Sequence, residues 1–597
     1  MKNIFTVALL SLPFATALHA NPPVTYTGTQ TATTAADGNL RPVVGVQNIQ
    51  VYRANRTAPT HVDQLSHTYQ HAPMLAYWRG KFYLEFLSAP VNEHDNPTDT
   101  SLTTSVDGLN WTAPQLIFPA VKLPNGEFTV THQRMGFYTA PDGRLLALAF
   151  HGKAPSPNDG TGLGRVVREI HADGTFGPIY FIRVNAGQTP AGFTLPYTLY
   201  KNSPDAGFVA ACDALLANKL MTAQWWEEEQ LDDTGFYTVR GKALSTIRRP
   251  DGSVLGVWKN SLVATTRDEG RTWTEKVFAG NMPNNASKYW LQATADKRYA
   301  LVLNPTNRLR HPLAVMTSDD SANFTDLLAV HGELPDQRFG GKLKNMGPQY
   351  VRGIVEGNGT PPDADRAFWL TYSVNKEDIW VARVPTPVSG VVTGPVNDTF
   401  ETDRAGTLPV GWNTYTPLWA PVRVVATDGP QKHVLELRDA EPHDYARAVR
   451  VFPATHGVKI TFKVFAAQKN ARLEIDLLDA HGARPVRLAL AEDGKLWACH
   501  EGQWFDAGAY AANQWQTFEL EIPVKATDDR CTLLVDGQPR LARPMFFTDP
   551  IETVERLSFR TGEYRDRGFG GRDLPGADTK APEAVFHVDD VVVTPLQ

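Results

Sequence analysis

The stretch Thr266-Arg-Asp268-Glu-Gly270-Arg-Thr272-Trp273 follows the pattern Ser/Thr-x-Asp-x-Gly-x-Thr-Trp. Ser105-Val-Asp107-Gly108-Leu-Asn-Trp111 repeats the pattern with one residue fewer, and Thr317-Ser-Asp319-Asp-Ser321-Ala-Asn-Phe324 is a degraded copy. Asp and Gly favour tight turns, because the Asp carboxylate bonds to nearby backbone N–H groups and Gly tolerates positive φ. Three copies of one turn indicate that the region from Val44 to Pro385 is built from repeated units.

The same region contains pairs of alternating apolar stretches around tight turns, most of which contain Gly. The four clearest pairs occupy residues 74–86, 137–150, 245–258 and 368–381. Alternation with period two around a tight turn is typical of β-hairpins. Because the hairpins recur irregularly along the chain, we expect radial repetition in a β-propeller rather than a single sandwich.

The repeated turn resembles the Asp-box of sialidase-like propellers, a hairpin turn between the outer strands of a blade. The resemblance implies that the Asp accepts hydrogen bonds within the turn and that the Trp packs between blades. Its role is therefore architectural and not catalytic. About 340 residues at about 50 per blade predict seven blades, with six as the alternative. The helix-prone run from Asp213 to Glu229 is expected to be an excursion between blades.

The C-terminal part is predicted to be a second all-β domain. We expect the propeller in residues 21–385, a Pro/Gly-rich linker in 386–396 and the second domain in 397–597. The last of these resembles a concanavalin-like jelly-roll β-sandwich. Such domains bind carbohydrate or brace a catalytic domain, and the sequence leaves both roles open.

Four carboxylates near the ends of the predicted sandwich raise the question of a metal. A structural Ca²⁺ is one reading and solvated edge carboxylates are the other. The residues concerned are Asp398, Glu401, Asp589 and Asp590.

Residues 1–20 have a short positive start, an apolar run and a small-residue exit, which is the pattern of a secretory signal peptide. The sequence thus predicts a secreted or periplasmic protein without a membrane span, and we expect a monomer. A net charge of −6 and the lack of a basic tract argue against a nucleic-acid partner. Export would permit a disulfide between Cys499 and Cys531, whereas Cys212 is expected to be a buried apolar residue.

Polar residues near the early hairpins are the first candidates for a functional site. Thr131-His132-Gln-Arg134 begins a hairpin that contains Tyr138 and returns to His151, so His132 and His151 are predicted to face one site. A second cluster, His67 to His71, precedes the first hairpin. The predicted catalytic residues are His132, His151, His71 and Tyr138, and the substrate-binding residues here are Arg134 and His67.

Later basic and aromatic residues are expected to line the same mouth of the channel and to bind substrate. They are Arg308, Arg310, Lys344, Tyr350 and Arg352. A set of His, Arg, Lys and Tyr residues without a dominant carboxylate pair favours an anionic substrate. The predicted partner is therefore an acidic polysaccharide or oligosaccharide.

The predicted reaction depends on what the sequence lacks as well as on what it contains. A standard glycosidase needs two facing carboxylates, and no such pair is evident. The early segment Val51-Tyr-Arg-Ala-Asn-Arg56 also lacks the arginine pattern of sialidases. β-Elimination from a uronate needs a group that neutralises the carboxylate, a base and a proton donor, and the His, Arg and Tyr candidates could supply them.

The propeller, the sandwich, the His-rich hairpins and the stretches 346–354 and 372–380 resemble the L-rhamnose-α-1,4-D-glucuronate lyase group, which is related to ulvan lyases and a propeller α-L-rhamnosidase. The resemblance implies a lyase that acts on arabinogalactan or gum arabic side chains, with Ca²⁺ as a candidate ion in the channel. Two alternatives remain open. One is a glycoside hydrolase, either an α-L-rhamnosidase or a sialidase-like exo-glycosidase, and the other is a non-catalytic glycan-binding propeller.

Overall fold

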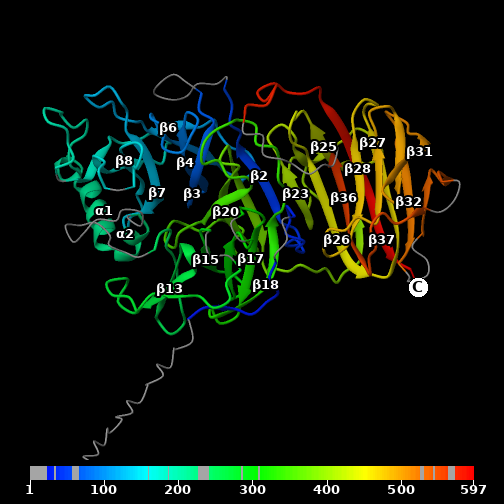
Figure 1. Ribbon diagram of the computed structural model, residues 1–597, viewed down its shortest axis with the longest axis horizontal. Coiled ribbons are helices and arrows are strands. Elements are labelled where there is room, and N and C mark those ends of the chain that lie inside the picture. The colour runs from blue at the N-terminus through cyan, green and yellow to red at the C-terminus, as the bar shows by residue number, and fades with distance from the viewer. Residues whose placement is uncertain are drawn as a thin grey trace, which may run out of the picture.

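The computed structural model describes most of the chain. The described residues are 23–31, 35–56, 66–158, 160–185, 187–225, 241–283, 287–306, 309–524, 530–541, 545–562 and 572–596, with only the backbone given for 133–135. The predicted signal peptide lies outside these residues. Figure 1 shows two all-β bodies side by side, a propeller and a sandwich.

The propeller has five four-stranded antiparallel blades in the described part of the chain. Blade 1 comprises β3 (Tyr69–Trp78), β4 (Lys81–Ala89), β5 (Asp99–Ser105) and β6 (Gln115–Phe118). Blade 2 comprises β7 (Val130–Thr139), β8 (Leu145–Gly152), β9 (Gly164–Ile170) and β10 (Tyr180–Val184). Blade 3 comprises β11 (Ser245–Arg248), β12 (Val254–Trp258), β13 (Leu262–Thr266) and β14 (Val277–Phe278).

Blade 4 comprises β15 (Trp290–Ala293), β16 (Tyr299–Leu303), β17 (Leu313–Ser318) and β18 (Asn323–His331), with β1 (Thr25–Tyr26) added in parallel to β18. Blade 5 comprises β19 (Pro348–Gly353), β20 (Ala367–Val374), β21 (Asp378–Pro385) and the N-terminal strand β2 (Gln47–Tyr52). The first strand of each blade lies innermost, around the central channel.

The prediction of a propeller is confirmed, but the expected number of seven blades, or six, is wrong. The error came from the assumed length of a blade, because several connections here are much longer than a hairpin turn. The longest joins β10 to β11 and contains α1 (Ala206–Ala217) and α2 (Lys219–Trp225), which confirms the expected excursion between blades. Two short 3₁₀ turns are also present: Tyr200–Asn202 precedes α1 in this same connection, and Lys259–Ser261 lies between β12 and β13.

Helices α1 and α2 meet at an angle of 85° and pack into the propeller core through residues such as Phe208, Leu215 and Trp225. Among the described residues no single helix is long and apolar enough to cross a bilayer, although this bent pair passes the same test by length and composition. Its burial against blade residues explains the apolar composition.

The three repeated turns have the expected hydrogen bonds. The Asp107 carboxylate accepts from the backbone N–H groups of Leu109 and Asn110, each at 2.8 Å. Asp268 accepts from the Thr272 N–H at 2.9 Å and from its hydroxyl at 2.6 Å. Trp111 packs between blades 1 and 5, in a cluster with Phe82 and Trp369, so the predicted architectural role fits.

The third turn differs by one residue from the predicted alignment. Asp320, and not Asp319, accepts from the N–H groups of Ala322 and Asn323 at 2.8 Å, and the Ser318 hydroxyl donates to it at 2.9 Å. Asp319 instead pairs with Arg298. The copy is thus Ser-x-Asp-x-x-Asn-Phe, which matches the Ser105–Trp111 copy position by position.

Strand β2 closes the propeller and also joins it to the sandwich. It pairs antiparallel with β21 on one side and parallel with β23 (Trp412–Thr416) on the other. Blade 5 and one sandwich sheet therefore form a single eleven-stranded sheet. Figure 1 shows β2, in blue, between the green blade 5 and the sandwich.

The sandwich consists of two sheets of seven main strands. The sheet continuous with blade 5 adds β26 (Arg447–Thr455), β36 (Val554–Thr561), β28 (Leu473–Leu478), β29 (Val486–Leu490), β30 (Lys495–His500) and β31 (Gln503–Ala509) to β23. The other contains β24 (Val422–Ala426), β25 (His433–Asp439), β37 (Ala584–Pro595), β27 (Gly457–Ala466), β32 (Trp515–Pro523), β33 (Arg530–Val535) and β34 (Gln538–Pro539), with β22 (Val396–Asp398) on β37 and β35 (Met545–Phe546) on β33.

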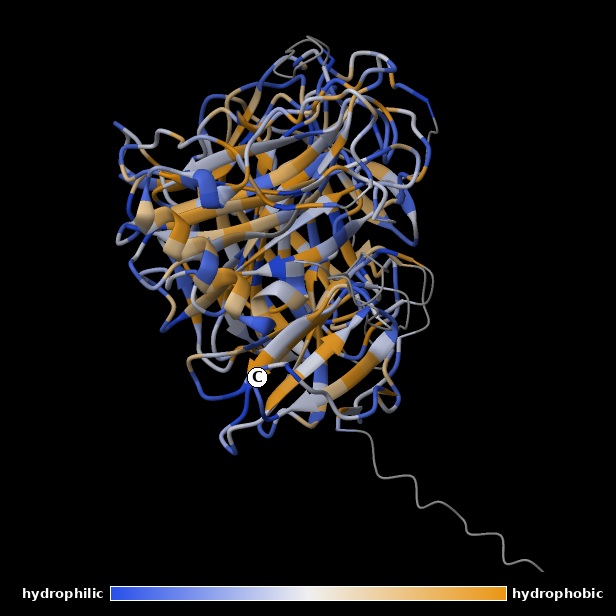
Figure 2. Ribbon diagram, turned by 90° about the vertical axis from the view of Figure 1, so that its left-hand side faces the viewer, coloured by the Kyte–Doolittle hydropathy of each residue, from blue (hydrophilic) through white to orange (hydrophobic). Residues whose placement is uncertain are grey.

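Alternating side chains of the two sheets form one apolar core, so the predicted β-sandwich is confirmed. Figure 2 shows apolar residues concentrated on the strands and hydrophilic residues in the connections. Cys499, Cys531 and Cys212 are all buried free thiols, so the Cys499–Cys531 disulfide that export would permit is not formed in the structure, and the interpretation of Cys212 as a buried residue holds.

The carboxylates considered for calcium have other partners. Asp398 accepts from the Trp412 indole at 3.0 Å and pairs with Arg450 at 2.6 Å, and Asp590 pairs with Lys463. Across the described ranges no group of three or more His, Cys, Asp or Glu side chains is placed to hold a metal ion. Calcium in the channel stays a prediction.

His331, at the end of β18, lies at the junction of propeller and sandwich. Its ring contacts the edges of Tyr372, Trp380 and Tyr415, and its Nδ1 bonds to the Tyr372 hydroxyl at 2.9 Å. Burial lowers the pKa of His331 to about 4, against an ordinary value of 6.5. The neutral imidazole is therefore part of this aromatic junction.

This burial predicts a loss of stability in mild acid. The unfolded chain takes up a proton at His331 below pH 6.5 while the folded chain does not, so the contribution is present above pH 6.5 and is lost as the pH falls towards 4. At pH 5 the cost is about 2 kcal/mol. We expect the melting temperature of His331→Gln to fall less between pH 7 and pH 5 than that of the parent, while His481→Gln on the surface behaves like the parent. Equal pH dependence of His331→Gln and parent would contradict the assignment.

Candidate functional site

The strand order of the blades places different residues at the two mouths of the central channel. Because successive strands are antiparallel, the starts of the innermost strands share one edge with the connections between second and third strands. The Asp-box turns and the turns between first and second strands share the opposite edge. We call these ends the Tyr350 mouth and the Asp-box mouth.

Tyr350 lies near the start of β19 and is partly exposed at its mouth. Its ring centroid is 4.0 Å from that of His71 on β3, and the Lys288 Nζ lies 4.1 Å from it. The Lys376 Nζ is 5.9 Å away, in the connection between β20 and β21. Segments from blades 1, 4 and 5 thus bring a phenol, an imidazole and two ammonium groups together.

A buried ion pair borders this cluster. Lys376 donates to the Glu93 carboxylate at 3.1 Å and to the Leu343 carbonyl at 2.6 Å. Burial is the largest single influence and would raise the pKa of Glu93, but the charges of Lys376 and His94 and the hydrogen bonds from Lys376 and Tyr69 together outweigh it, so the pKa lies below its ordinary value. Glu93 is therefore ionised, and it is placed to hold Lys376 rather than to donate a proton.

Backbone strain collects at the same mouth. Ala72, His94 and Tyr350 all have positive φ, at 50°, 72° and 60°, which non-glycine residues rarely adopt. The innermost strands β3 and β19 have register shifts beside Ala72 and Tyr350, and β7 has one at the same level. Strained backbone and bulges of this kind concentrate at functional sites.

His71 is held in place by blade 5. Its Nδ1 is bonded to the Ser373 hydroxyl at 2.7 Å, and the side chain is almost fully buried. His67, also buried, has its Nδ1 3.4 Å from the Ser88 hydroxyl. The structure thus places the predicted His71 in the cluster, with His67 in the segment just before it.

The expectation that His132 and His151 face one site is wrong. Thr131 pairs with His151 and His132 pairs with Phe150, so the two imidazoles project from opposite faces of blade 2. His132 stacks on His94, with centroids 5.6 Å apart, towards the Tyr350 mouth. The His151 Nδ1 bonds to the Thr129 and Thr131 hydroxyls at 3.0 Å, and burial lowers its pKa to about 4.

Three further predicted site residues make contacts within the folded core and do not lie at the Tyr350 mouth. Tyr138 is near the end of β7, in the core towards the Asp-box mouth. The Lys344 side chain is fully buried and donates to Glu377 and to the carbonyls of Thr68 and Phe339. Arg352 is buried and donates to the Leu244 carbonyl at 3.0 Å.

The remaining basic candidates are only partly described. The Arg134 side chain and Arg308 lie outside the described residues. Arg310 lies in the connection between β16 and β17, at the Tyr350 mouth, and its charge acts on Lys376. Lys288, Lys376 and Arg310 thus bring cationic groups to the Tyr350 mouth, where Lys376 is paired with Glu93.

Lys288, Lys376, Glu93 and His94 were missed from the sequence. Lys288 and Lys376 stand in connections next to innermost or second strands, where a lysine reads as an ordinary surface residue. Their positions along the chain could have identified them, because a basic residue just before an innermost strand must lie at the channel mouth. As an arrangement, the site can bind an anion and offers a phenol and imidazoles for nucleophilic and proton-transfer chemistry.

Three family models match parts of the chain. "Beta-prop_BT_1020:-like, N-terminal beta propeller" matches residues 22–242, "BNR repeat-like domain" matches 221–360, and "Sialidase-like, CBM domain" matches 412–580. A search of curated protein sequences gives no match.

Among solved structures, one named "Sialidase" is 37% identical, with a TM-score of 0.88 over 96% of this chain and 54% of its own. The chain therefore spans about half the length of that protein. Trypanosoma rangeli sialidase is 12% identical with a TM-score of 0.35, covering 93% of this chain and 97% of its own. An exo-β-1,3-galactanase from Phanerochaete chrysosporium is 8% identical with a TM-score of 0.28, covering 92% and 99%.

The predicted kinship with sialidase-like propellers is thus confirmed, whereas none of these matches is to a polysaccharide lyase. The blades and Asp-box turns agree with the matched models, so the chain is similar to sialidase-like BNR β-propellers over residues 22–360 and to a sialidase-like carbohydrate-binding-module domain over residues 412–580.

Proposed function

We propose that the protein is a glycoside hydrolase that releases a carboxylated sugar from the end of a glycan, with Tyr350 as the nucleophile. The observation that carries the proposal is the strained Tyr350, with its ring against His71 and the Lys288 ammonium, at one mouth of a sialidase-like propeller. A tyrosine hydroxyl acts as a nucleophile when an adjacent group can take up its proton, and the His71 ring is adjacent here.

The charge at the mouth supports an anionic substrate. Lys288, Lys376 and Arg310 bring cationic groups to this mouth, and Glu93 pairs with Lys376. The chain as a whole has a net charge of −6, so the local excess of cations would distinguish this mouth from the rest of the surface. Acidic glycan ends, including a terminal uronate or sialate, fit this requirement.

A tyrosine nucleophile suits such a substrate. Retaining glycosidases usually attack with a carboxylate, but sialidases are exceptions that use Tyr. In the proposed first step the Tyr350 oxygen bonds to the anomeric carbon and passes its proton to the adjacent His71, the glycosidic C–O bond breaks, and the leaving oxygen takes a proton. His94 is the proposed donor, because its side chain is partly exposed and stacks on His132. Water then displaces Tyr350: the water oxygen bonds to the anomeric carbon, His94 takes the water proton, and His71 returns its proton to the Tyr350 oxygen.

The lyase reading loses part of its support. It assigned catalytic roles to His132, His151, His71 and Tyr138, and of these the His132, His151 and Tyr138 side chains lie in different places. It remains the alternative that the assay below can detect. As a further proposal, the signal-like residues 1–20 direct the protein out of the cytoplasm. Acidic polysaccharides would then be within its reach outside the cell or in the periplasm.

The reaction products separate hydrolase from lyase. We expect incubation with gum arabic and with a 4-methylumbelliferyl sialoside to release a free acidic sugar from at least one of them, without absorbance near ~235 nm, which reports an unsaturated uronate formed by elimination. Growth of that absorbance would contradict the hydrolase proposal in favour of the lyase. Binding without any product would favour the non-catalytic propeller.

Removing the Tyr350 hydroxyl tests the nucleophile. For Tyr350→Phe we expect kcat on the identified substrate to fall at least ~10³-fold, since losing a nucleophile removes transition-state stabilisation that no other group replaces. Tyr138→Phe is the matched control, because Tyr138 lies on an innermost strand but towards the Asp-box mouth, and its kcat should stay near that of the parent. Activity of Tyr350→Phe within tenfold of the parent, with unchanged melting temperature, would exclude Tyr350 from the chemistry.

A further inference from the structure

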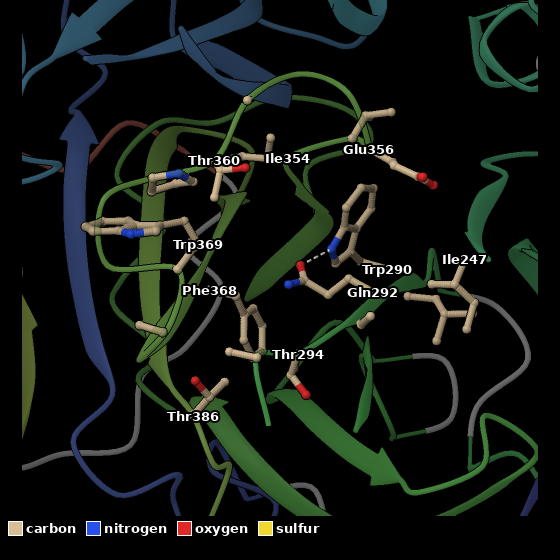
Figure 3. Close-up of a pocket in the computed structure, with 18 of the residues that line it drawn as sticks. Ile247, Trp290, Gln292, Thr294, Ile354, Glu356, Thr360, Phe368, Trp369 and Thr386 are labelled. Atoms are coloured by element: carbon tan, nitrogen blue, oxygen red, sulfur yellow. Dashed lines mark hydrogen bonds between the residues drawn. The ribbon is translucent and has the colours of Figure 1, made fainter. Parts of the chain in front are cut away.

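The Asp-box mouth holds a cavity at the opposite end of the propeller from Tyr350. Its volume is about 360 Å³, within the range of small-ligand sites. The walls come from the ends of β11 and β15 and from the connection between β19 and β20. Figure 3 shows these segments surrounding the cavity.

The lining combines indole and phenyl rings with uncharged polar groups. Trp290, Phe368 and Trp369 form apolar walls, and Gln292, Thr294 and Thr360 supply an amide and hydroxyls (Figure 3). Because uncharged polar groups stand between the rings, this lining differs from a wholly apolar groove that would receive a protein helix. It matches the surface of a pyranose, which offers C–H faces and hydroxyl groups.

The amide of Gln292 is held in one orientation. The Trp290 indole N–H donates to its Oε1 at 2.7 Å, which leaves the NH₂ group to donate elsewhere. In Figure 3 that NH₂ group points into the space before Phe368 and Trp369. The backbone of Gly353 approaches both side chains so closely that a Cβ there would lie 2.3 Å from the Trp290 indole nitrogen. The donor is thus fixed before any ligand arrives.

The charges around the cavity disfavour an anionic ligand. Arg248 is the basic residue in its lining, and it pairs with Glu269 at 2.5 Å and with Glu356 at 3.1 Å. One guanidinium therefore faces two carboxylates, which gives this rim a local charge of −1. The Tyr350 mouth has the opposite character, with Lys288 and Arg310.

We propose that this cavity is a second carbohydrate site, which binds a neutral sugar residue of the glycan without cleaving it. The two mouths would then select two chemically different parts of one substrate, an acidic residue at the Tyr350 mouth and a neutral one here. The binding itself does not depend on whether Tyr350 is catalytic.

Saturation-transfer-difference NMR with methyl glycosides tests the site. The probes are the methyl glycosides of galactose, glucose, xylose and rhamnose, with methyl glucuronide as the charged probe. We expect at least one neutral probe to show saturation transfer that Thr360→Trp abolishes by filling the cavity and that Gln292→Ala reduces severalfold. Thr532→Trp, which adds the same indole at an exposed position of the sandwich, is the matched control and should leave the signal unchanged.

The result has two opposing readings. Loss of the neutral-probe signal in Thr360→Trp, with the signal retained in Thr532→Trp, supports the site. A signal that survives Thr360→Trp, no signal for any neutral probe, or a stronger signal for methyl glucuronide at this site overturns the proposal. Because no turnover is measured, failure here is separate from failure of the hydrolase assay.

Discussion

Closure of the propeller by β2 is the constraint on which the rest of the structure depends. A strand from the N-terminal part of the chain completes the blade formed by its last propeller strands, through the pairing of Gln47–Tyr52 with β21. The Asn48 side chain extends this closure, since it donates to the Val330 carbonyl and accepts from the Tyr372 hydroxyl at 2.7 Å. With the ring closed, β19 lies beside β3, and only then do Tyr350 and His71 meet.

The parts of the fold that depend on local sequence were predictable, and the parts that depend on distances along the chain were not. The turns at Asp107 and Asp268 are fixed by side-chain to backbone hydrogen bonds within a few residues, so their pattern is visible in the sequence. The degraded copy could be placed only to within one residue, because adjacent Asp319 and Asp320 both fit. The blade number was wrong because the length of each connection is set by what it packs against, which local patterns do not report.

The same distinction applies to the candidate site. His71 and Tyr350 were identified because they stand at the starts of hairpins. The prediction that His132 and His151 face one site was wrong because it depended on the strand register. A register shift of one residue moves a side chain to the other face of the sheet. Lys344 was predicted to bind substrate, but it is buried against Glu377, which lies 33 residues away in the sequence. Lys376 was not predicted, because its position at the mouth depends on the ion pair with Glu93 on another blade.

The parallel pairing of β2 with β23 also bears on how the protein avoids self-association. In a propeller without the sandwich, β2 would be an outer strand with a free row of backbone N–H and C=O groups, and such edges promote aggregation between chains. Here β23 covers that row and continues it into the sandwich sheet. The C-terminal domain therefore protects an edge of the propeller, whether or not it also binds a glycan.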